Sequence, residues 1–293
     1  MTDAPLVHVP DIPPPLERSR LASFVIHATL FLFSIVMLYP LLWMLSGSLK
    51  DQSEIFGQAT LLPSNVDFSA YFRGWFGGQV SFGSYFWNSL VIAVLSVIGN
   101  VLSCSLAAYA FARLHFWGRN VWFALMLGTL MLPYHVTLIP QYILFLKLGW
   151  INTILPLVVP KFMAVDAFFI FLMVQFFRGI PRELDEAAMM DGCSPWRIYW
   201  RIMLPLSLPV LATAAIFSFI WTWDDFFGPL IYLSDINSYT VQLGLRSFVD
   251  STGSSDWSGL FAMSSLSLVP VFLIFLFFQR LLIDGIATAG LKR

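Results

Sequence analysis

Two adjacent acidic residues, Asp224 and Asp225, lie in a strongly apolar part of the chain and have aromatic neighbours on both sides. Trp221 and Trp223 precede them, and two phenylalanines follow. Aromatic rings stack on the C–H faces of sugars and carboxylates accept hydrogen bonds from hydroxyl groups, so this cluster suits a polyhydroxylated solute. The same residues would also suit packing against another subunit or pairing with a basic residue there, and the sequence leaves both interpretations open.

A second pair of charges, Lys161 and Asp166, lies in another apolar segment. A charge at the centre of a bilayer costs roughly 2.5–3.5 kcal/mol, so such residues tend to line an aqueous path. Pro156 and Pro160 permit the irregular backbone that is tolerated where a cavity is lined. The alternative is that the pair lies near the membrane surface. The candidate residues of a translocation path are Lys161, Asp166, Trp221, Trp223, Asp224 and Asp225.

The residue types that carry covalent chemistry are not arranged for it. The sequence contains no G-x-x-x-x-G-K-[ST] phosphate-binding loop, and its four histidines are scattered without metal-ligand spacing. The net charge of −1 gives no basic field for nucleic acid. Cys104 and Cys193 fall in different compartments, which implies no disulfide. The sequence therefore predicts a protein without catalytic residues, a metal site or a bound cofactor.

Long apolar segments dominate the chain. Hydrophobic residues make up 58% and charged residues 11%, whereas an ordinary soluble domain is about 25% charged. Since about 20 apolar residues cross a bilayer as a helix, we expect an all-α integral membrane protein with six transmembrane helices in residues 21–293. A disordered tail is expected in residues 1–20, which are rich in proline. The expected spans are about 21–45, 85–111, 120–146, 154–177, 206–233 and 259–283.

The distribution of basic residues predicts the orientation in the membrane. With the N-terminus inside, eleven of the 16 Lys and Arg residues lie in cytoplasmic segments and five lie elsewhere. Both termini are then cytoplasmic, in a multi-pass protein of the cytoplasmic membrane. Residues 178–205 form a cytoplasmic loop, and residues 46–84 and 234–258 face outward.

The loop 178–205 contains residues that typically begin and end two helices. Pro181 suits the first turn of a helix, and Gly192 suits the left-handed position that follows its end. Ser194 can cap a second helix that begins with Pro195. Leu184, Ala187, Ala188 and Asp191 share one face of the first helix. The pattern predicts a helix–turn–helix at the membrane surface, either presented to a partner or resting on lipid.

The spacing within this loop resembles a known family. E-A-A at 186–188, three residues, Gly192, nine residues and then Ile202-x-Leu204-Pro205 are similar to the EAA loop of permease subunits in bacterial ABC importers. The likeness extends to A-A-Y-A-F-A-R at 107–113 and to the C-terminal residues 279–293, which resemble the carbohydrate-uptake class. The chain looks most like a second permease of the maltose type.

The resemblance implies a coupling helix seated in a groove of a cytoplasmic ATPase dimer, which would bind ATP and Mg²⁺. Glu186 would contact the ATPase, Ala187 and Ala188 would pack against it near Asp191, and Gly192 would form the turn. Ile202, Leu204 and Pro205 would fix the loop to the fifth span. The other implied partners are a second homologous permease, an extracytoplasmic solute-binding protein and membrane lipid. The implied function is ATP-driven alternating access that imports a sugar or sugar-like solute.

Two alternatives stay open. One is a proton- or ion-coupled secondary transporter with Asp166, Asp224 or Asp225 as its ion site, whose uptake an uncoupler would abolish. The other is an importer of the same architecture for glycerol phosphoesters, which would need a basic residue in the path, and only Lys161 is placed for that.

Overall fold

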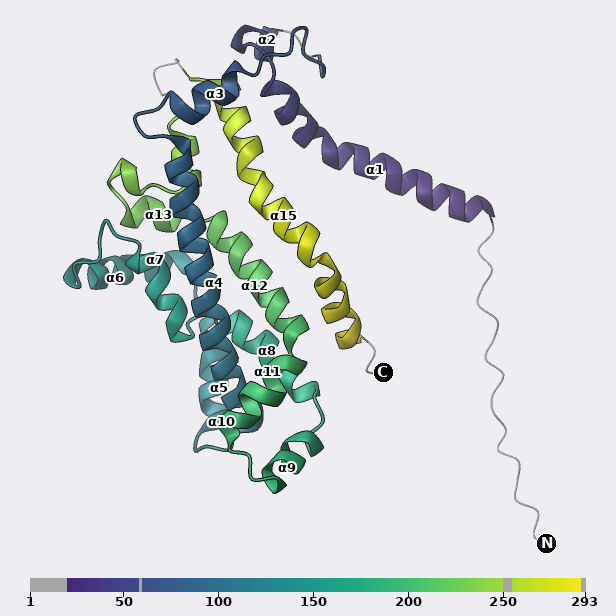
Figure 1. The fold of residues 1–293 in the computed structure, drawn as a ribbon, viewed down its shortest axis with the longest axis vertical. Helices are drawn as coiled ribbons and strands as arrows, with labels where there is room; N and C mark the ends of the chain where they lie inside the picture. The colour runs from purple at the N-terminus through teal and green to yellow at the C-terminus, as the bar shows by residue number, and fades with distance from the viewer. Residues whose placement is uncertain (1–19, 58–59, 250–254, 291–293) are drawn as a thin grey trace. The chain divides into compact units, whose positions relative to one another are not determined.

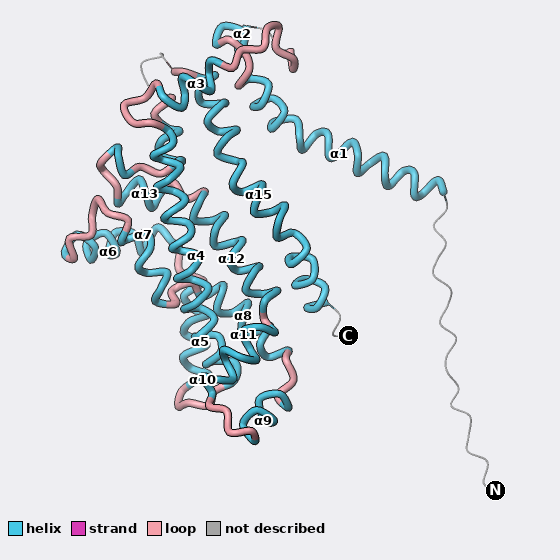
Figure 2. The backbone as a smooth tube through the Cα atoms, viewed as in Figure 1, coloured by secondary structure: helices cyan, strands magenta, loops and turns pink. Residues whose placement is uncertain are grey.

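A computed structural model describes residues 20–57, 60–249 and 255–290, with the side chains of residues 134, 135 and 280–290 left out. All regular secondary structure in these ranges is helical (Figure 2). The expected disordered tail lies outside the described residues, apart from Arg20. The chain forms two units, residues 1–44 and residues 45–293.

The described part of the first unit belongs to one helix, α1 (Arg20–Gly47). An 18-residue stretch of this 28-residue helix has a mean hydropathy of 2.3, and the helix spans about 42 Å at 1.5 Å per residue, which exceeds the thickness of a bilayer core. The polar side chains inside it are satisfied within the helix: Thr29 donates to the Val25 carbonyl and Ser34 to the Leu30 carbonyl. This helix confirms the first expected membrane-crossing segment as a long apolar helix.

Four long helices organise the second unit (Figure 1). They are α4 (Phe82–Arg113), α8 (Ala167–Gly179), α12 (Leu208–Trp223) and α15 (Trp257–Gly290). Helix α4 packs against both α8 and α12, and α12 packs against α15. Small residues buried along α4 allow these close contacts; they are Ala93, Ser96, Gly99, Ser105, Ala108 and Ala112.

Another element approaches α4 closely at Gly99. A Cβ atom added there would lie 2.5 Å from the ring of Phe162, so a larger residue would displace this ring. Phe162 belongs to the 3-10 helix η1 (Val159–Met163). The ring of Phe162 therefore lies in a notch of α4.

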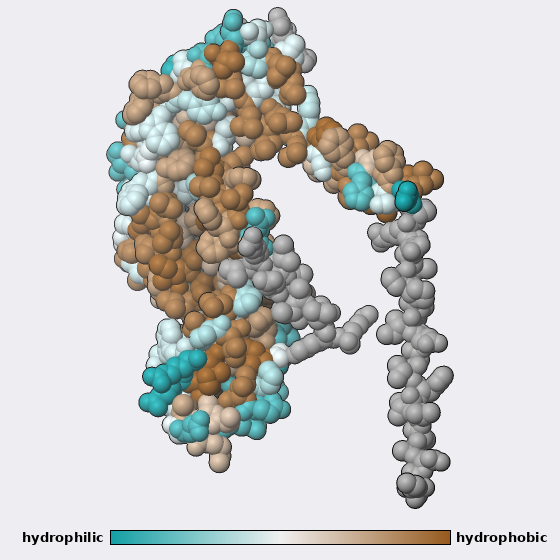
Figure 3. All heavy atoms as spheres, turned by 45° about the vertical axis from the view of Figure 1, so that its right-hand side comes forward, coloured by the Kyte–Doolittle hydropathy of each residue, from teal (hydrophilic) through white to brown (hydrophobic). Residues whose placement is uncertain are grey.

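Two hydrophobic clusters form the core of the second unit, one at each end. The first joins α4, α8 and the start of α12 to α9 (Glu183–Met190), α10 (Pro195–Ile198) and the π-helix η2 (Tyr199–Met203). We call this the loop end. The second joins the other ends of α4, α12 and α15 to α3 (Ser69–Phe76) and α14 (Val241–Arg246), and we call it the opposite end. Hydrophobic residues cover the middle of the unit, and hydrophilic residues gather near its ends (Figure 3).

The remaining short helices complete the two ends. At the opposite end they are α2 (Gln52–Gly57), α13 (Phe227–Tyr232) and η3 (Ile236–Ser238), and α11 (Leu204–Leu206) joins η2 to α12. A 77° bend at Ser207 separates Pro195–Leu206 from Leu208–Trp223.

The expected spans differ in how continuous they are. In the described residues, four helical segments have the length and apolarity to cross a membrane, or five if the bent pair is one span. The third expected span is divided into α5 (Arg119–Thr129) and α6 (Tyr134–Lys147), with Pro133 before α6. Proline lacks the N–H that would continue a helix, which explains the division. The count of six spans stays a prediction.

Two other spans are interrupted near their charged residues. The fourth consists of α7 (Leu155–Val158), η1 and α8, with Ala164 in the left-handed region at φ 54°. The fifth was expected to continue to residue 233, but α12 ends at Trp223 and α13 begins at Phe227. Asp224 and Asp225 therefore lie in a helix break and not within a helix.

Candidate functional site: a helical loop and a polar cavity

The turn of the loop 178–205 is built as its sequence predicts. Gly192 has φ +74° directly after the end of α9. Its N–H donates to the Met189 carbonyl at 3.0 Å, and the N–H of Cys193 donates to the Ala188 carbonyl at 2.9 Å. These two bonds are the Schellman arrangement, which satisfies carbonyls that a helix end leaves free. Helix α9 begins at Glu183, two residues after Pro181.

The second helix of the loop begins with the predicted cap. The Ser194 hydroxyl accepts a hydrogen bond from the Arg197 N–H at 3.4 Å, and Pro195 occupies the first helical position. The chain continues through the π-helix η2, which the sequence did not indicate. The half-buried side chains of Ile202 and Leu204 pack against the core cluster of the loop end, while Pro205 is exposed.

The face of α9 that the sequence assigned to a partner is only partly available. Ala188 is 7% exposed and belongs to the core of this chain, which leaves little of its surface for another subunit. Glu186, Ala187 and Asp191 are exposed. Met190 is 89% exposed, and Leu184 also reaches solvent. Exposed apolar side chains with acidic neighbours are typical of a surface that another protein covers.

Arg113, the last residue of α4, contacts α9 directly. Its guanidinium lies 3.3 Å from the Asp185 carboxylate, and both side chains are nearly buried. It also donates to the carbonyls of Phe177 and Ile180, at 2.7 and 2.6 Å, where α8 ends. Burial raises the pKa of Asp185, and the attraction of Arg113 offsets only part of that rise. The sequence analysis did not single out Asp185.

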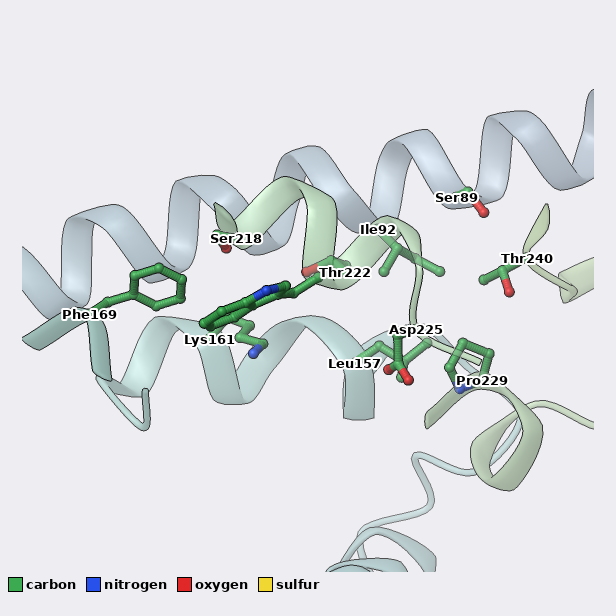
Figure 4. Close-up of a pocket in the computed structure, with 11 residues that line it drawn as sticks. Ser89, Ile92, Leu157, Lys161, Phe169, Ser218, Thr222, Asp225, Pro229 and Thr240 are labelled. Atoms are coloured by element: carbon green, nitrogen blue, oxygen red, sulfur yellow. The ribbon is translucent and has the colours of Figure 1, made fainter. Parts of the chain in front are cut away.

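Three of the six candidate path residues meet at one cavity. Lys161, Trp221 and Asp225 line a space of about 80 Å³ between η1, α4 and α12 (Figure 4). Four hydroxyl groups, which sequence reasoning missed, join them: Ser89, Ser218, Thr222 and Thr240. The hydroxyl of Thr240 is buried and has no hydrogen-bond partner in the protein. Such an atom needs a water or a solute group as its partner.

The other three candidates lie elsewhere. Trp223 is buried in the core of the opposite end, where its indole N–H donates to the Ser267 carbonyl at 3.0 Å. Asp224 is exposed and accepts a hydrogen bond from Gln242 at 3.5 Å. Asp166 pairs with Lys161 at 2.9 Å across the break in the fourth span. Nothing in the sequence distinguishes Trp221 from Trp223, because a tertiary contact decides which of them is buried.

The backbone at this break is held by α4. The Ser103 hydroxyl donates to the Lys161 carbonyl at 2.8 Å and accepts from the Ala164 N–H at 3.1 Å. One side chain thus satisfies a donor and an acceptor that the interruption frees. This contact explains how a left-handed alanine persists within an apolar segment. Among the described residues, no three His, Cys, Asp or Glu side chains are placed to hold a metal ion.

Comparison with known proteins shows which proteins this chain is similar to. Residues 99–287 match the family described as "binding-protein-dependent transport system inner membrane component". The chain is 35% identical over 263 residues to a probable ABC transporter permease protein, YurM of Bacillus subtilis, covering 90% of this chain and 86% of the relative. It is 31% identical over 265 residues to the diacetylchitobiose uptake system permease protein NgcG of Streptomyces coelicolor, covering 90% and 87%.

A solved structure shows the same fold. A chain of a bacterial ABC transporter involved in the import of the acidic polysaccharide alginate superposes with a TM-score of 0.79 at 26% identity, covering 91% of this chain and 99% of that one. The family match extends over more than half of the sequence and includes the loop and the cavity-lining residues other than Ser89 and Ile92. This chain therefore belongs to the family of inner membrane components of binding-protein-dependent transport systems, as a non-catalytic permease subunit of an ABC transporter.

Proposed function

We propose that this permease subunit carries a sugar or sugar-like solute into the cell by ATP-driven alternating access. The relatives named for diacetylchitobiose uptake and alginate import support a saccharide solute. The cavity adds hydroxyl groups, a carboxylate and an exposed indole ring, which suit a polyhydroxylated molecule. The alternative of an ion-coupled secondary transporter does not match the family of the chain. A phosphoester would compete with Asp166 for Lys161, because the two are already paired.

The exposed face of α9 is the proposed docking surface for the ATPase subunit, and it is the observation that carries this proposal. Met190 supplies apolar surface, and Glu186, four residues earlier on the same side of α9, supplies negative charge beside it. The Schellman turn and the buried Ala188 hold this face on the core, so a force on α9 reaches the bundle. ATP and Mg²⁺ would bind to the ATPase and not to this chain.

The complete importer would contain other subunits. A permease of this family works with an ATPase and a solute-binding protein. We infer a second homologous permease, an ATPase dimer on the cytoplasmic side and an extracytoplasmic binding protein on the other. The loop end would then be cytoplasmic, as would both termini, in agreement with the distribution of Lys and Arg.

The cavity would form one part of the translocation path. Its volume of about 80 Å³ holds two or three waters at roughly 30 Å³ each. Pockets for organic ligands are typically about 300 Å³ or larger. A sugar can therefore pass only when the cavity widens, and the helices beside it are interrupted at Ala164 and after Trp223.

The docking surface is tested by reversing one charge on it. We expect Glu186→Lys to insert in the membrane but to lose the ATPase subunit on co-purification, together with ATP-dependent uptake. Asp51→Lys is the matched control, since Asp51 is an exposed acid directly before α2 at the opposite end and its carboxylate bonds to the nearby Ser53. Normal co-purification and uptake in Glu186→Lys would contradict the docking site. Loss of both in Asp51→Lys as well would show a general effect of charge.

A further inference from the structure

A line of polar side chains on α4 contacts each part of the loop in turn. Ser105, Tyr109 and Arg113 are spaced four residues apart and so lie on one face of the helix. We call them the α4 stripe. Polar residues are costly in a membrane helix unless they meet partners, so three on one face indicate a common role.

Each member of the stripe bonds to a different element of the loop. Arg113 contacts Asp185 of α9. The Tyr109 hydroxyl donates to the Pro195 carbonyl at 3.0 Å, at the start of α10. The Ser105 hydroxyl lies 2.7 Å from the Tyr199 hydroxyl in η2, and all of these contacts are buried or partly buried.

The Ser105 hydroxyl is held on two sides. It lies 3.0 Å from the Leu102 carbonyl, to which it can donate, and 2.7 Å from the Tyr199 hydroxyl, where either oxygen can be the donor. Tyr199 also packs on the Tyr109 ring, with centroids 5.3 Å apart. The loop is therefore fixed to α4 by hydrogen bonds and by aromatic packing together.

The same helix reaches the cavity. Ser89 and Ile92, near the other end of α4, line the space that Lys161 and Asp225 share. Helix α4 is continuous from Phe82 to Arg113 and contains no proline, whereas the fourth and fifth spans are both interrupted. Of the helices around the cavity, α4 is the one that transmits a displacement along its length without a joint.

We propose that the α4 stripe, Ser105, Tyr109 and Arg113, positions the loop so that its displacement by the ATPase moves α4 and thereby the cavity. This inference rests on the proposed docking of the ATPase on α9. The Arg113–Asp185 contact also has room to change. Arg113 Nε and Asp185 Oδ1 are buried without hydrogen-bond partners, so a second arrangement of the pair can satisfy both atoms.

The test measures movement at the cavity and not activity alone. In a background with Cys104 and Cys193 replaced by alanine, Thr222→Cys places one thiol at the cavity. A maleimide reports its accessibility in the assembled importer, with and without a non-hydrolysable ATP analogue. We expect the unaltered stripe to give a clear ATP-dependent change in labelling rate.

Tyr109→Phe removes one hydroxyl and keeps the ring, and Arg113→Lys keeps the charge but loses the planar fork. The double variant should reduce the ATP-dependent change at least about fivefold, because one net hydrogen bond contributes about a factor of five and Tyr109→Phe removes one outright. The ATPase subunit should still co-purify. The controls are Tyr71→Phe, whose hydroxyl bonds to Ser48 at the opposite end, and Arg119→Lys, which bonds only the nearby Leu114 carbonyl.

Two outcomes would overturn the proposal. One is a labelling change in the double variant equal to that of the unaltered stripe. The other is loss of the ATPase subunit from Tyr109→Phe alone, which would mean that the stripe folds the docking surface. An error in the docking site gives a different result: with the stripe intact, Glu186→Lys would keep both the ATPase subunit and the labelling change.

Discussion

At the loop end, the polar side chains of α4 are joined to other elements of the chain, whereas at the cavity one buried hydroxyl has no protein partner. Arg113 meets three acceptors, the carbonyls of Phe177 and Ile180 and the Asp185 carboxylate, and Tyr109 meets α10. At the cavity the Thr240 hydroxyl is the unpartnered group, and two helix breaks lie beside it. The loop end is thus bonded to α4 at several points, whereas the cavity leaves a hydroxyl that a water or a solute can bind.

The largest difference between the two ends should appear when matching glycines are replaced. Gly192 and Gly149 both have φ near +70° and both donate an N–H to the carbonyl three residues earlier. Proline fits neither position, since its φ is fixed at about −65° and it has no N–H. We expect Gly192→Pro to abolish ATP-dependent uptake and ATPase co-purification. Gly149→Pro should lower thermal stability yet keep the ATPase subunit, and equal loss from both variants would remove the distinction.

Breaking the ion pair beside the cavity should have a smaller effect than the glycine substitutions. In Asp166→Asn, Lys161 keeps its charge but loses the partner 2.9 Å away. Both side chains are about 30% exposed, so water compensates part of the loss and we expect about 1 kcal/mol of destabilisation. The double variant Lys161→Met/Asp166→Asn should be more stable than Asp166→Asn alone. Thermal unfolding in detergent measures this cycle, and strictly additive effects would show that the pair does not interact.

Substitutions of the two neighbouring aspartates should have different effects on transport. Asp225 lines the cavity and Asp224 lies outside it. If a solute hydroxyl bonds to Asp225, Asp225→Asn should raise the apparent KM several-fold, because a hydrogen bond to a charged group is worth about 1.5–3 kcal/mol before water replaces part of it. Asp224→Asn should leave KM within about twofold. Uptake of the solute carried by the binding protein provides the measurement, and the reverse order would move the path away from the cavity.

The smallest effect should be on the pH dependence of stability, where Asp185 and Asp67 act in opposite directions. Burial raises the pKa of Asp185 above 3.8, so the folded state binds more protons than the unfolded state, and stability falls as pH rises from 3.8 through the raised pKa. Hydrogen bonds from Ser69 lower the pKa of Asp67 below 3.8. These bonds stabilise the fold above pH 3.8, and the stabilisation is lost as the pH falls through the lowered pKa.

Unfolding temperatures between pH 3 and 6 test this pair of acids. Asp185→Asn should reduce the fall in unfolding temperature toward the upper end of this pH range. Asp67→Asn should flatten the loss on the acidic side, and its effect should be the weaker because Asp67 is fully exposed. Changes of the same sign in both variants would contradict the contrast.

Local signals in the sequence were enough for the apolar helices and for the turn of the loop. Gly192, Ser194 and Pro195 act through their own backbone or that of near neighbours, so their positions could be predicted. The left-handed Ala164 could not, because alanine gives no such signal and the support comes from Ser103, 61 residues away. The burial of Ala188 was missed for a related reason: alanine is compatible with either face of α9, and only tertiary packing decides between them.

The α4 stripe shows where sequence reading can improve. Polar residues spaced four apart on a long apolar helix were visible in the sequence, but their partners lie up to 94 positions away. The fifth span was expected to run on to residue 233 because apolar residues continue on both sides of Asp224 and Asp225, although α12 ends at Trp223, directly before these two acids. In both cases the periodicity identified a helix and could not identify what the helix contacts.

The ring of Phe162 in the notch at Gly99 restricts how α4 can move. An axial slide of α4 past η1 would drive the ring into the larger side chains above or below the glycine. A tilt about the ring leaves that contact in place. In such a tilt the notch would be the pivot, and a small swing of α4 at its Arg113 end would be matched by an opposite swing at its Ser89 end. Filling the notch with an alanine would remove the pivot while leaving every polar contact of the loop untouched.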